Sequence, residues 1–230
     1  MLSEPRTISL ILELVHLPAT HAPEKLREVY NEVCRTCGFE NFTRIPGGAR
    51  IERKDPEGEG FSQLNLSGDR IQLVEDHTGM SIDEFGKRSL AVLASAMPKL
   101  GIPILLVQQN TLRVTANPNG YRSASEYLAR SIFRFQPEDL EVLSRPVHLF
   151  GFRLAFPATV QQPVNYNTRV EGYVRDSRSL YVETVATFKT PIQASQTELV
   201  HTNLNTTAAF VVDRIFPFLS QFDRREVAEE

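Results

Sequence analysis

"IPILLVQQNTLRVTA", residues 102 to 116, is the stretch on which the fold depends, because a second series of elements begins there. Its apolar and β-branched residues predict a long strand. A complete series of elements precedes it and ends at Gly101, and a similar series follows it. The sequence therefore divides into two halves, residues 1–101 and 102–230, that repeat one order of elements without recognisable identity.

The first half begins with a strand over residues 7–17, where leucines alternate with more polar positions. An apolar stripe at three- and four-residue steps then predicts a helix from Pro23 to the capping Gly38. Ser81 and Glu84 form a capping box that starts a long helix. Between the helices we expect three or four short strands, "NFTRI", "ARIER", "SQLNL" and "RIQLVE".

The second half follows its long strand with a turn and a helix opened by a second capping box, Ser123 and Glu126. A short helix and a phenylalanine-rich strand, "VHLFGFRLAF", come next. An alternating hairpin is expected to turn at Asp176 to Ser179. Residues 197–222 predict the closing long helix, so the order is again strand, helix, antiparallel strands and long helix.

This order predicts an α+β fold built as a tandem pseudo-symmetric repeat, with a curved antiparallel sheet backed by the long helices in one compact unit. The order resembles the TATA-box-binding-protein fold, a saddle of two such repeats, over nearly the whole chain. That resemblance implies a nucleic-acid-binding saddle with a basic sheet and phenylalanine wedges. Here the expected sheet face mixes both signs of charge: Glu13, Arg113, Arg153, Arg169, Glu171, Arg175 and Glu183.

The segment "LRVTAN" carries a second resemblance. A leucine-arginine step, Leu112 and Arg113, is followed by Asn117 at the end of a middle strand. This pattern is similar to that of an uncharacterised family of bacterial proteins of about this length. The resemblance implies no activity.

The charge balance argues against nucleic acid as a partner. The chain has 25 basic and 28 acidic residues, interspersed along it, and divides as 12 basic to 15 acidic in residues 1–101 and 13 to 13 in residues 102–230. A protein that neutralises several phosphates needs clustered excess cation. We therefore expect no duplex binding at physiological salt. The start of the chain has no basic region before its short apolar run, which predicts a cytoplasmic protein with no membrane partner.

The two cysteines, Cys34 and Cys37, form a C-x-x-C pattern near the end of the first helix. Structural zinc needs four ligands, and the sequence has no second pair of cysteines or histidines at matching spacing. His16 and His21, the histidines nearest in sequence, could complete such a site only if the fold brought them to the cysteines. A thioredoxin-type pair lies at the N-terminal end of a helix, where the helix dipole lowers the thiol pKa, whereas these cysteines are expected at the C-terminal end. We therefore expect two buried, reduced thiols that pack in the core, with no metal and no cofactor.

Glu75, Asp76 and His77 stand at the end of a hairpin strand, just before the capped helix. These residue types can form an acid/base set or bind a metal, so the alternative function is a small-molecule enzyme with a site around them. Ordinary turn residues in a solvated loop would look the same. Glu171 and Glu183 are expected to face each other in the second hairpin as cross-strand positions.

The remaining signal is a surface rich in arginine and tyrosine, residue types favoured in recognition. The candidate binding residues are Arg113, Arg153, Arg169, Tyr173, Arg175 and Tyr181. The sequence contains no nucleophile elbow, phosphate-binding loop or dinucleotide fingerprint. We therefore expect a non-catalytic binding or assembly module that uses its sheet face or the cleft between its repeats, with a protein or small ligand as partner. Self-association as a homodimer is also expected, because exposed sheet edges need cover.

Overall fold

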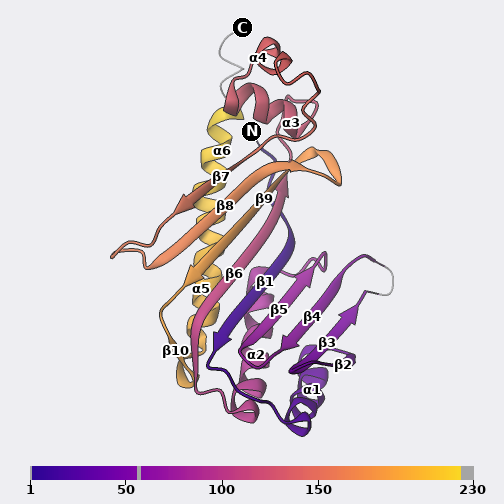
Figure 1. The fold of residues 1–230 in the computed structure, drawn as a ribbon, viewed down its shortest axis with the longest axis vertical. Coiled ribbons are helices and arrows are strands. Elements are labelled where there is room, and N and C mark those ends of the chain that lie inside the picture. The colour runs from indigo at the N-terminus through magenta and orange to yellow at the C-terminus, as the bar shows by residue number, and fades with distance from the viewer. Residues whose placement is uncertain (1, 56–57, 224–230) are drawn as a thin grey trace.

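The computed structural model describes residues 2–55 and 58–223 and has the predicted α+β class. Within that part of the chain, strands from both halves join in one ten-stranded sheet in which neighbouring strands are antiparallel. Figure 1 shows the long helices lying behind this sheet, so that one face carries them and the other is open.

The first half has the predicted elements in the predicted order. Their bounds are β1 (Arg6–His16), α1 (Pro23–Cys37), β2 (Asn41–Ile45), β3 (Gly48–Lys54), β4 (Phe61–Leu66), β5 (Arg70–Asp76) and α2 (Ile82–Leu100). The capping box is present, since the Ser81 hydroxyl accepts from the Glu84 amide and the Glu84 carboxylate accepts from the Ser81 amide. Gly38 and Gly101 end the two helices in the left-handed conformation, with φ of 71° and 66°.

The second half keeps the expected order but differs in detail. Its elements are β6 (Ile104–Ala116), α3 (Ala124–Tyr127), the π-helix η1 (Leu128–Phe133), α4 (Pro137–Glu141), β7 (Gly151–Phe156), β8 (Val164–Tyr173), β9 (Asp176–Phe188), β10 (Ile192–Gln193), the 3₁₀ turn η2 (Ala194–Gln196), α5 (Glu198–Phe210), the π-helix η3 (Val211–Ile215) and α6 (Phe216–Asp223). The phenylalanine-rich strand is shorter than expected and begins at Gly151. The expected second capping box is half formed, because Glu126 accepts from the amide of Arg122 rather than from that of Ser123.

The hairpin turn between β8 and β9 lies earlier than the sequence pattern indicated. Tyr173 pairs with Asp176, so Val174 and Arg175 form a two-residue loop. The Asp176 carboxylate accepts hydrogen bonds from the Arg178 amide at 3.1 Å and the Ser179 hydroxyl at 2.5 Å. These polar residues therefore organise the start of β9, and the predicted turn at Asp176 to Ser179 is wrong.

The strand order is β2-β3-β4-β5-β1-β6-β9-β8-β7, and β10 pairs with β6. Each half supplies one contiguous part of the sheet, and the first strands of the halves, β1 and β6, pair at the centre. Their register places Leu10 opposite Leu112 and Glu13 opposite Gln109. Residues far apart in sequence therefore share rows that run across both halves.

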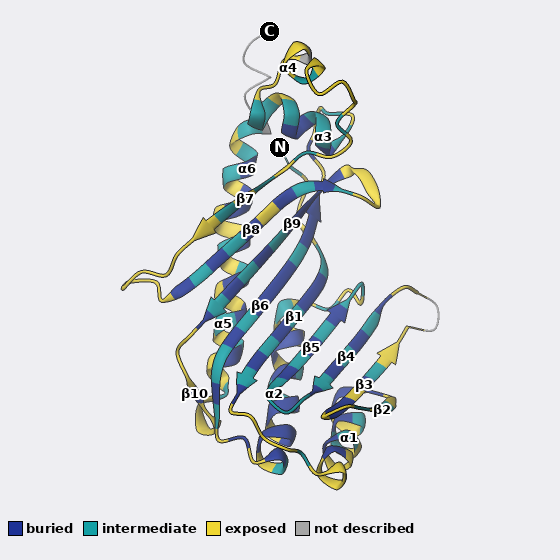
Figure 2. Cartoon of the chain, viewed as in Figure 1, coloured by how far each residue is buried: buried dark blue, intermediate teal, exposed yellow. Residues whose placement is uncertain are grey.

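The core lies between the sheet and the helices. Along β1, Leu10, Leu12 and Leu14 are almost inaccessible, while the alternating Ile11 and Glu13 are half-buried on the open face. Figure 2 shows the same alternation of buried and partly accessible positions along the neighbouring strands. The burial of these apolar side chains against α1, α2 and α5 supplies the main stabilisation of the sheet.

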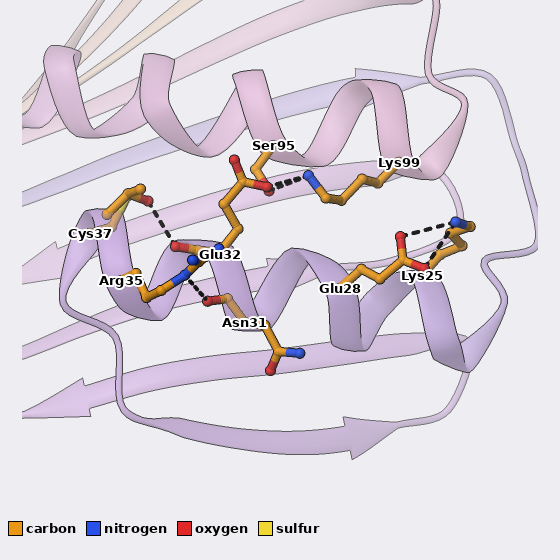
Figure 3. Close-up of polar contacts among 9 residues, drawn as sticks. Lys25, Glu28, Asn31, Glu32, Arg35, Cys37, Ser95 and Lys99 are labelled. Atoms are coloured by element: carbon orange, nitrogen blue, oxygen red, sulfur yellow. Dashed lines mark hydrogen bonds and ion pairs between the residues drawn. The ribbon is translucent and has the colours of Figure 1, made fainter.

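The helices are held together by specific contacts. Figure 3 shows Ser95 and Lys99 of α2 directed toward Glu32 of α1, where both donate to one carboxylate oxygen. Gly86 of α2 contacts His201 of α5 so closely that a Cβ would lie 2.2 Å from the imidazole. A side chain at Gly86 would therefore separate the helices that connect the two halves.

Candidate functional site

The candidate site is a charged cluster on the open face of β6, β9 and β8. Register places Arg113 opposite Glu183, and Glu183 opposite Arg169. Three strands therefore put an Arg-Glu-Arg row across the sheet, with the acid in the middle. Alternation along each strand aims all three side chains at the face that the helices leave open.

Both arginines bind the central glutamate. Arg113 Nε donates to Glu183 Oε2 at 2.7 Å, and Arg169 Nη2 lies 3.2 Å from Glu183 Oε1. Arg169 Nη1 also lies 3.6 Å from the Glu171 carboxylate. The side chain of Glu183 is 17% exposed and that of Arg169 is 46% exposed, so the acid is shielded while the arginine reaches solvent.

Two tyrosines complete the cluster. The Tyr181 hydroxyl donates to Glu183 Oε2 at 3.0 Å, and the Arg169 guanidinium lies 5.4 Å from the Tyr181 ring centre. The Tyr173 ring is nearly parallel to that of Tyr181, with 5.8 Å between centroids. Burial raises the pKa of Tyr181 to about 12, so the hydroxyl remains a donor at neutral pH.

The environment keeps Glu183 ionised. Burial by itself would raise the pKa of its carboxyl, but hydrogen bonds from Arg113 and Tyr181 and the charges of Arg113 and Arg169 lower it overall. The cluster is therefore a fixed arrangement of charges in which each acid already has a cationic partner.

The structure brings together four of the six candidate binding residues: Arg113, Arg169, Tyr173 and Tyr181. Arg153 pairs with Arg169 in the register and extends the row onto β7, where its guanidinium donates to Asn167. Arg175 lies in the hairpin turn and forms a 3.0 Å ion pair with Glu59, from the loop between β3 and β4.

Two details of the predicted face need correction. Tyr181 lies on the predicted face, but it is only 9% exposed because Tyr173, Arg169 and Glu183 pack around it. Glu171 and Glu183 do not face each other, since Glu171 pairs with Tyr181. The pairing of Glu171 follows from the early turn together with the register shift between Gly172 and Tyr173.

The open face also carries a row of amides that the sequence analysis did not find. Asn65 Nδ2 donates to Gln72 Oε1 at 2.9 Å, and Gln72 Nε2 donates to Glu13 Oε2 at 3.3 Å. Arg70 forms a 3.1 Å ion pair with Glu13. Alternation along each strand puts these side chains on the open face, but only the strand order reveals that they form one network.

The structure separates the proposed acid/base set. Glu75 points to the helix side, where it is 3% exposed and accepts from Arg88 Nη1 at 2.5 Å and from Ser62 Oγ at 2.6 Å. Asp76 Oδ2 instead lies 2.9 Å from His77 Nδ1. A cavity of about 220 Å³ reaches Glu75 and Arg88 without including Asp76 or His77 among its lining residues. The three residues therefore do not converge on one space.

The thiols occupy different environments. Cys37 is buried on the apolar stripe of α1, and this burial raises the pKa of its thiol. Cys34 lies beside that stripe and is half-buried, so it is less buried than Cys37 and less buried than the sequence predicts. Among the described residues, no three histidine, cysteine, aspartate or glutamate side chains gather in a way that could hold a metal ion.

No helix in residues 2–55 or 58–223 combines the length and apolar character needed to cross a bilayer. Comparison with known protein families and with characterised proteins found no match for this chain.

Proposed function

We propose that the chain is a non-catalytic binding or assembly protein whose open sheet face receives a protein partner. The observation that carries this proposal is the Arg113–Glu183–Arg169 row, which is held in place by Tyr181 on a face that the described helices leave uncovered. A preordered cluster of arginine and tyrosine lowers the entropy cost of binding and suits recognition.

The charge of this face favours a protein partner over nucleic acid. Arg113 and Arg169 share Glu183, Arg169 also approaches Glu171, and Arg70 binds Glu13. A phosphate backbone would have to compete with these carboxylates for the guanidinium groups. A protein surface that offers its own carboxylates, amides and carbonyls can add to the existing pairs.

The tandem pseudo-symmetric repeat belongs to the same proposal. Its support is the central antiparallel pairing of β1 with β6, with the remaining strands of each half extending outward. Each half also ends in a long helical segment, α2 or α5. A repeat of this kind would give the assembly one broad face instead of two separate ones.

Photo-crosslinking tests where a partner docks. A photoreactive amino acid would replace Asn167, on the open face beside the cluster, and in a matched control would replace Ala94, an exposed residue of α2. Illumination in the native host should give a discrete protein adduct from position 167 and none from position 94. The adduct should disappear when Arg113 and Arg169 are changed to alanine.

Self-association is the simplest form of such assembly. Light scattering measures it at protein concentrations from about 1 to about 100 µM, which cover the range of typical interface affinities. We expect a symmetric homodimer that the Arg113→Ala/Arg169→Ala variant weakens at least about tenfold. A strict monomer together with no adduct at position 167 would overturn the proposed function.

A further inference from the structure

The helix side of the second half holds a cavity of about 490 Å³ that is separate from the open face. It lies where α5, which runs behind the sheet in Figure 1, faces β8, β9 and β10. Its apolar lining includes Val164, Tyr166, Phe188, Ile192 and Phe210. A volume of this size with an apolar lining is typical of small-molecule sites.

Comparison with the first half explains why the space is present. There, α1 packs beside α2 and covers β3, so the outer strands have a helix beneath them. In the second half, α3 packs against the end of β8 that contains Gly172. A Cβ added to this glycine would lie 4.0 Å from the Cβ of Ala124 in α3. Val164 is eight residues away on β8, about 26 Å along the strand, and lies outside the reach of this short helix.

The walls of this cavity form an apolar cluster distinct from the main core. Val164, Tyr166, Ala186 and Phe188 contact one another and Phe210. A fully buried threonine pair, Thr168 and Thr184, separates this cluster from the main core, and their hydroxyls are 3.0 Å apart. The main core begins at the next inward positions of the same strands, Val170 and Val182. The Tyr166 ring stacks on Phe210 at 3.8 Å, which gives the cavity rigid aromatic walls.

The charges around the cavity indicate an uncharged ligand. The charged residues among its lining are one acid, Asp213, and one base, Arg214, so the lining has no net charge. Asn203, on the same wall, donates through Nδ2 to Gln108 at 2.8 Å. Its Oδ1 accepts from none of the described residues, so this oxygen can serve as an acceptor for a ligand N–H or O–H group.

We propose that this cavity binds a small neutral aromatic molecule carrying one hydrogen-bond donor. The aromatic walls supply stacking and apolar contact, and the Asn203 carboxamide supplies the acceptor. This site lies on the opposite side of the sheet from the charged cluster and does not depend on the function proposed for the open face.

N-phenyl-1-naphthylamine is a suitable probe, because it is neutral and aromatic, has one N–H group and fluoresces in apolar surroundings. Titration of the full chain should give saturable binding to one site, with a dissociation constant on the order of 10 µM. Anilinonaphthalene sulfonate, a related anion, should bind about tenfold more weakly because the site has no net positive charge.

Two filling variants locate the binding. Ala209→Trp and Thr206→Trp add bulk from exposed positions that line the cavity, and each should weaken binding about tenfold. Asn205→Trp adds the same side chain at an exposed position of α5 outside the lining and should leave binding unchanged. Circular dichroism and thermal unfolding would verify that all three variants fold.

Loss of probe binding in the two filling variants, with retention in Asn205→Trp, would support the assigned site. Absence of saturable binding, or equal binding by folded filling variants and the native chain, would overturn it. Tighter binding of the anionic probe would overturn the assignment of a neutral ligand.

Discussion

Glu75 on β5 and Glu183 on β9 are both bound by arginine, yet they lie on opposite faces of the sheet. The side chain of Glu75 is 2% exposed and that of its partner Arg88 is 14% exposed. The side chain of Glu183 is 17% exposed, and its partners Arg113 and Arg169 are 35% and 46% exposed. Burial therefore distinguishes a structural ion pair from one that a partner can reach.

The partners of the two glutamates reinforce this difference. Arg88 makes further contacts within the protein, since it also donates to Ser62 Oγ at 3.1 Å and to the Cys37 carbonyl at 2.5 Å. Glu75 and Arg88 thus connect β5, α2 and the end of α1. Arg169 keeps part of its guanidinium in solvent, where it is available for binding.

Removal of the Glu75 charge should have the largest effect on the free energy of unfolding. Glu75→Gln leaves Arg88 buried without its carboxylate, so the free energy of unfolding should fall by about 3 kcal/mol. Urea unfolding followed by circular dichroism measures this loss. Glu75→Gln/Arg88→Met should recover part of it, because the double variant leaves no unpaired buried charge. A loss below about 1 kcal/mol for Glu75→Gln would contradict the structural role of this pair.

The matched change on the open face should lower the free energy of unfolding by less than Glu75→Gln does. Glu183→Gln should lower the free energy of unfolding by about 1 kcal/mol or less, because its partner arginines reach solvent. Unfolding under the same conditions as Glu75→Gln permits direct comparison. The same variant should weaken the proposed assembly, and equal stability losses for the two variants would remove the distinction between them.

The sign of the pH dependence follows from the lowered pKa of Glu183. Its carboxylate stabilises the fold above the unfolded pKa, and this contribution is lost as the pH falls through the folded pKa. The difference in stability between the native chain and Glu183→Gln should therefore diminish in acid. Unfolding measured at a series of pH values below neutrality tests this, and a difference that grows in acid would contradict it.

Tyr181 tests the same cluster through the ionisation of its phenol at alkaline pH. Its pKa is raised to about 12, so the neutral phenol favours the fold below pH 10 and this contribution is lost as pH rises further. Ultraviolet difference spectra of the native chain and Tyr181→Phe isolate the phenolate signal. Ionisation of Tyr181 near its usual pKa in folded protein would contradict the buried cluster.

The smallest effect is expected for Cys34. Cys34→Ser should change the free energy of unfolding by less than about 0.5 kcal/mol, because the side chain lies at the edge of the apolar stripe. A thiol reagent should modify Cys34 in the folded protein and Cys37 only after unfolding. Metal analysis of untagged protein should find no stoichiometric zinc, and zinc lost in Cys34→Ser would overturn the interpretation of these thiols.

Much of the secondary structure could be predicted because its signals are local. The capping box of Ser81 and Glu84 and the glycine at position 38 define helix ends through groups within one turn. The second hairpin was predicted less well. Asp176 and Ser179 are common turn residues, but here they bind each other at the start of a strand.

The candidate site was found in part. Arginine and tyrosine at alternating positions of β6, β8 and β9 indicated a face that could bind a partner, and four of those residues lie together in the cluster. Arg175 was placed wrongly because one shift in the turn moves it off the strand. The cavity beneath α5 could not be predicted, because it depends on where α3 packs instead of on any motif.

The sequence by itself determined the α+β class, the order of the elements and which residues of each strand share a face, because helix and strand periodicities act over a few residues. The tertiary structure decided that the Glu75–Arg88 pair is buried and that the arginines bound to Glu183 reach solvent. The groups that surround these glutamates come from distant segments: the Cys37 carbonyl that accepts from Arg88 lies 51 residues before it, and Arg113 lies 70 residues before Glu183. Strand order and helix packing bring such residues together, and no local pattern in the chain encodes those distances.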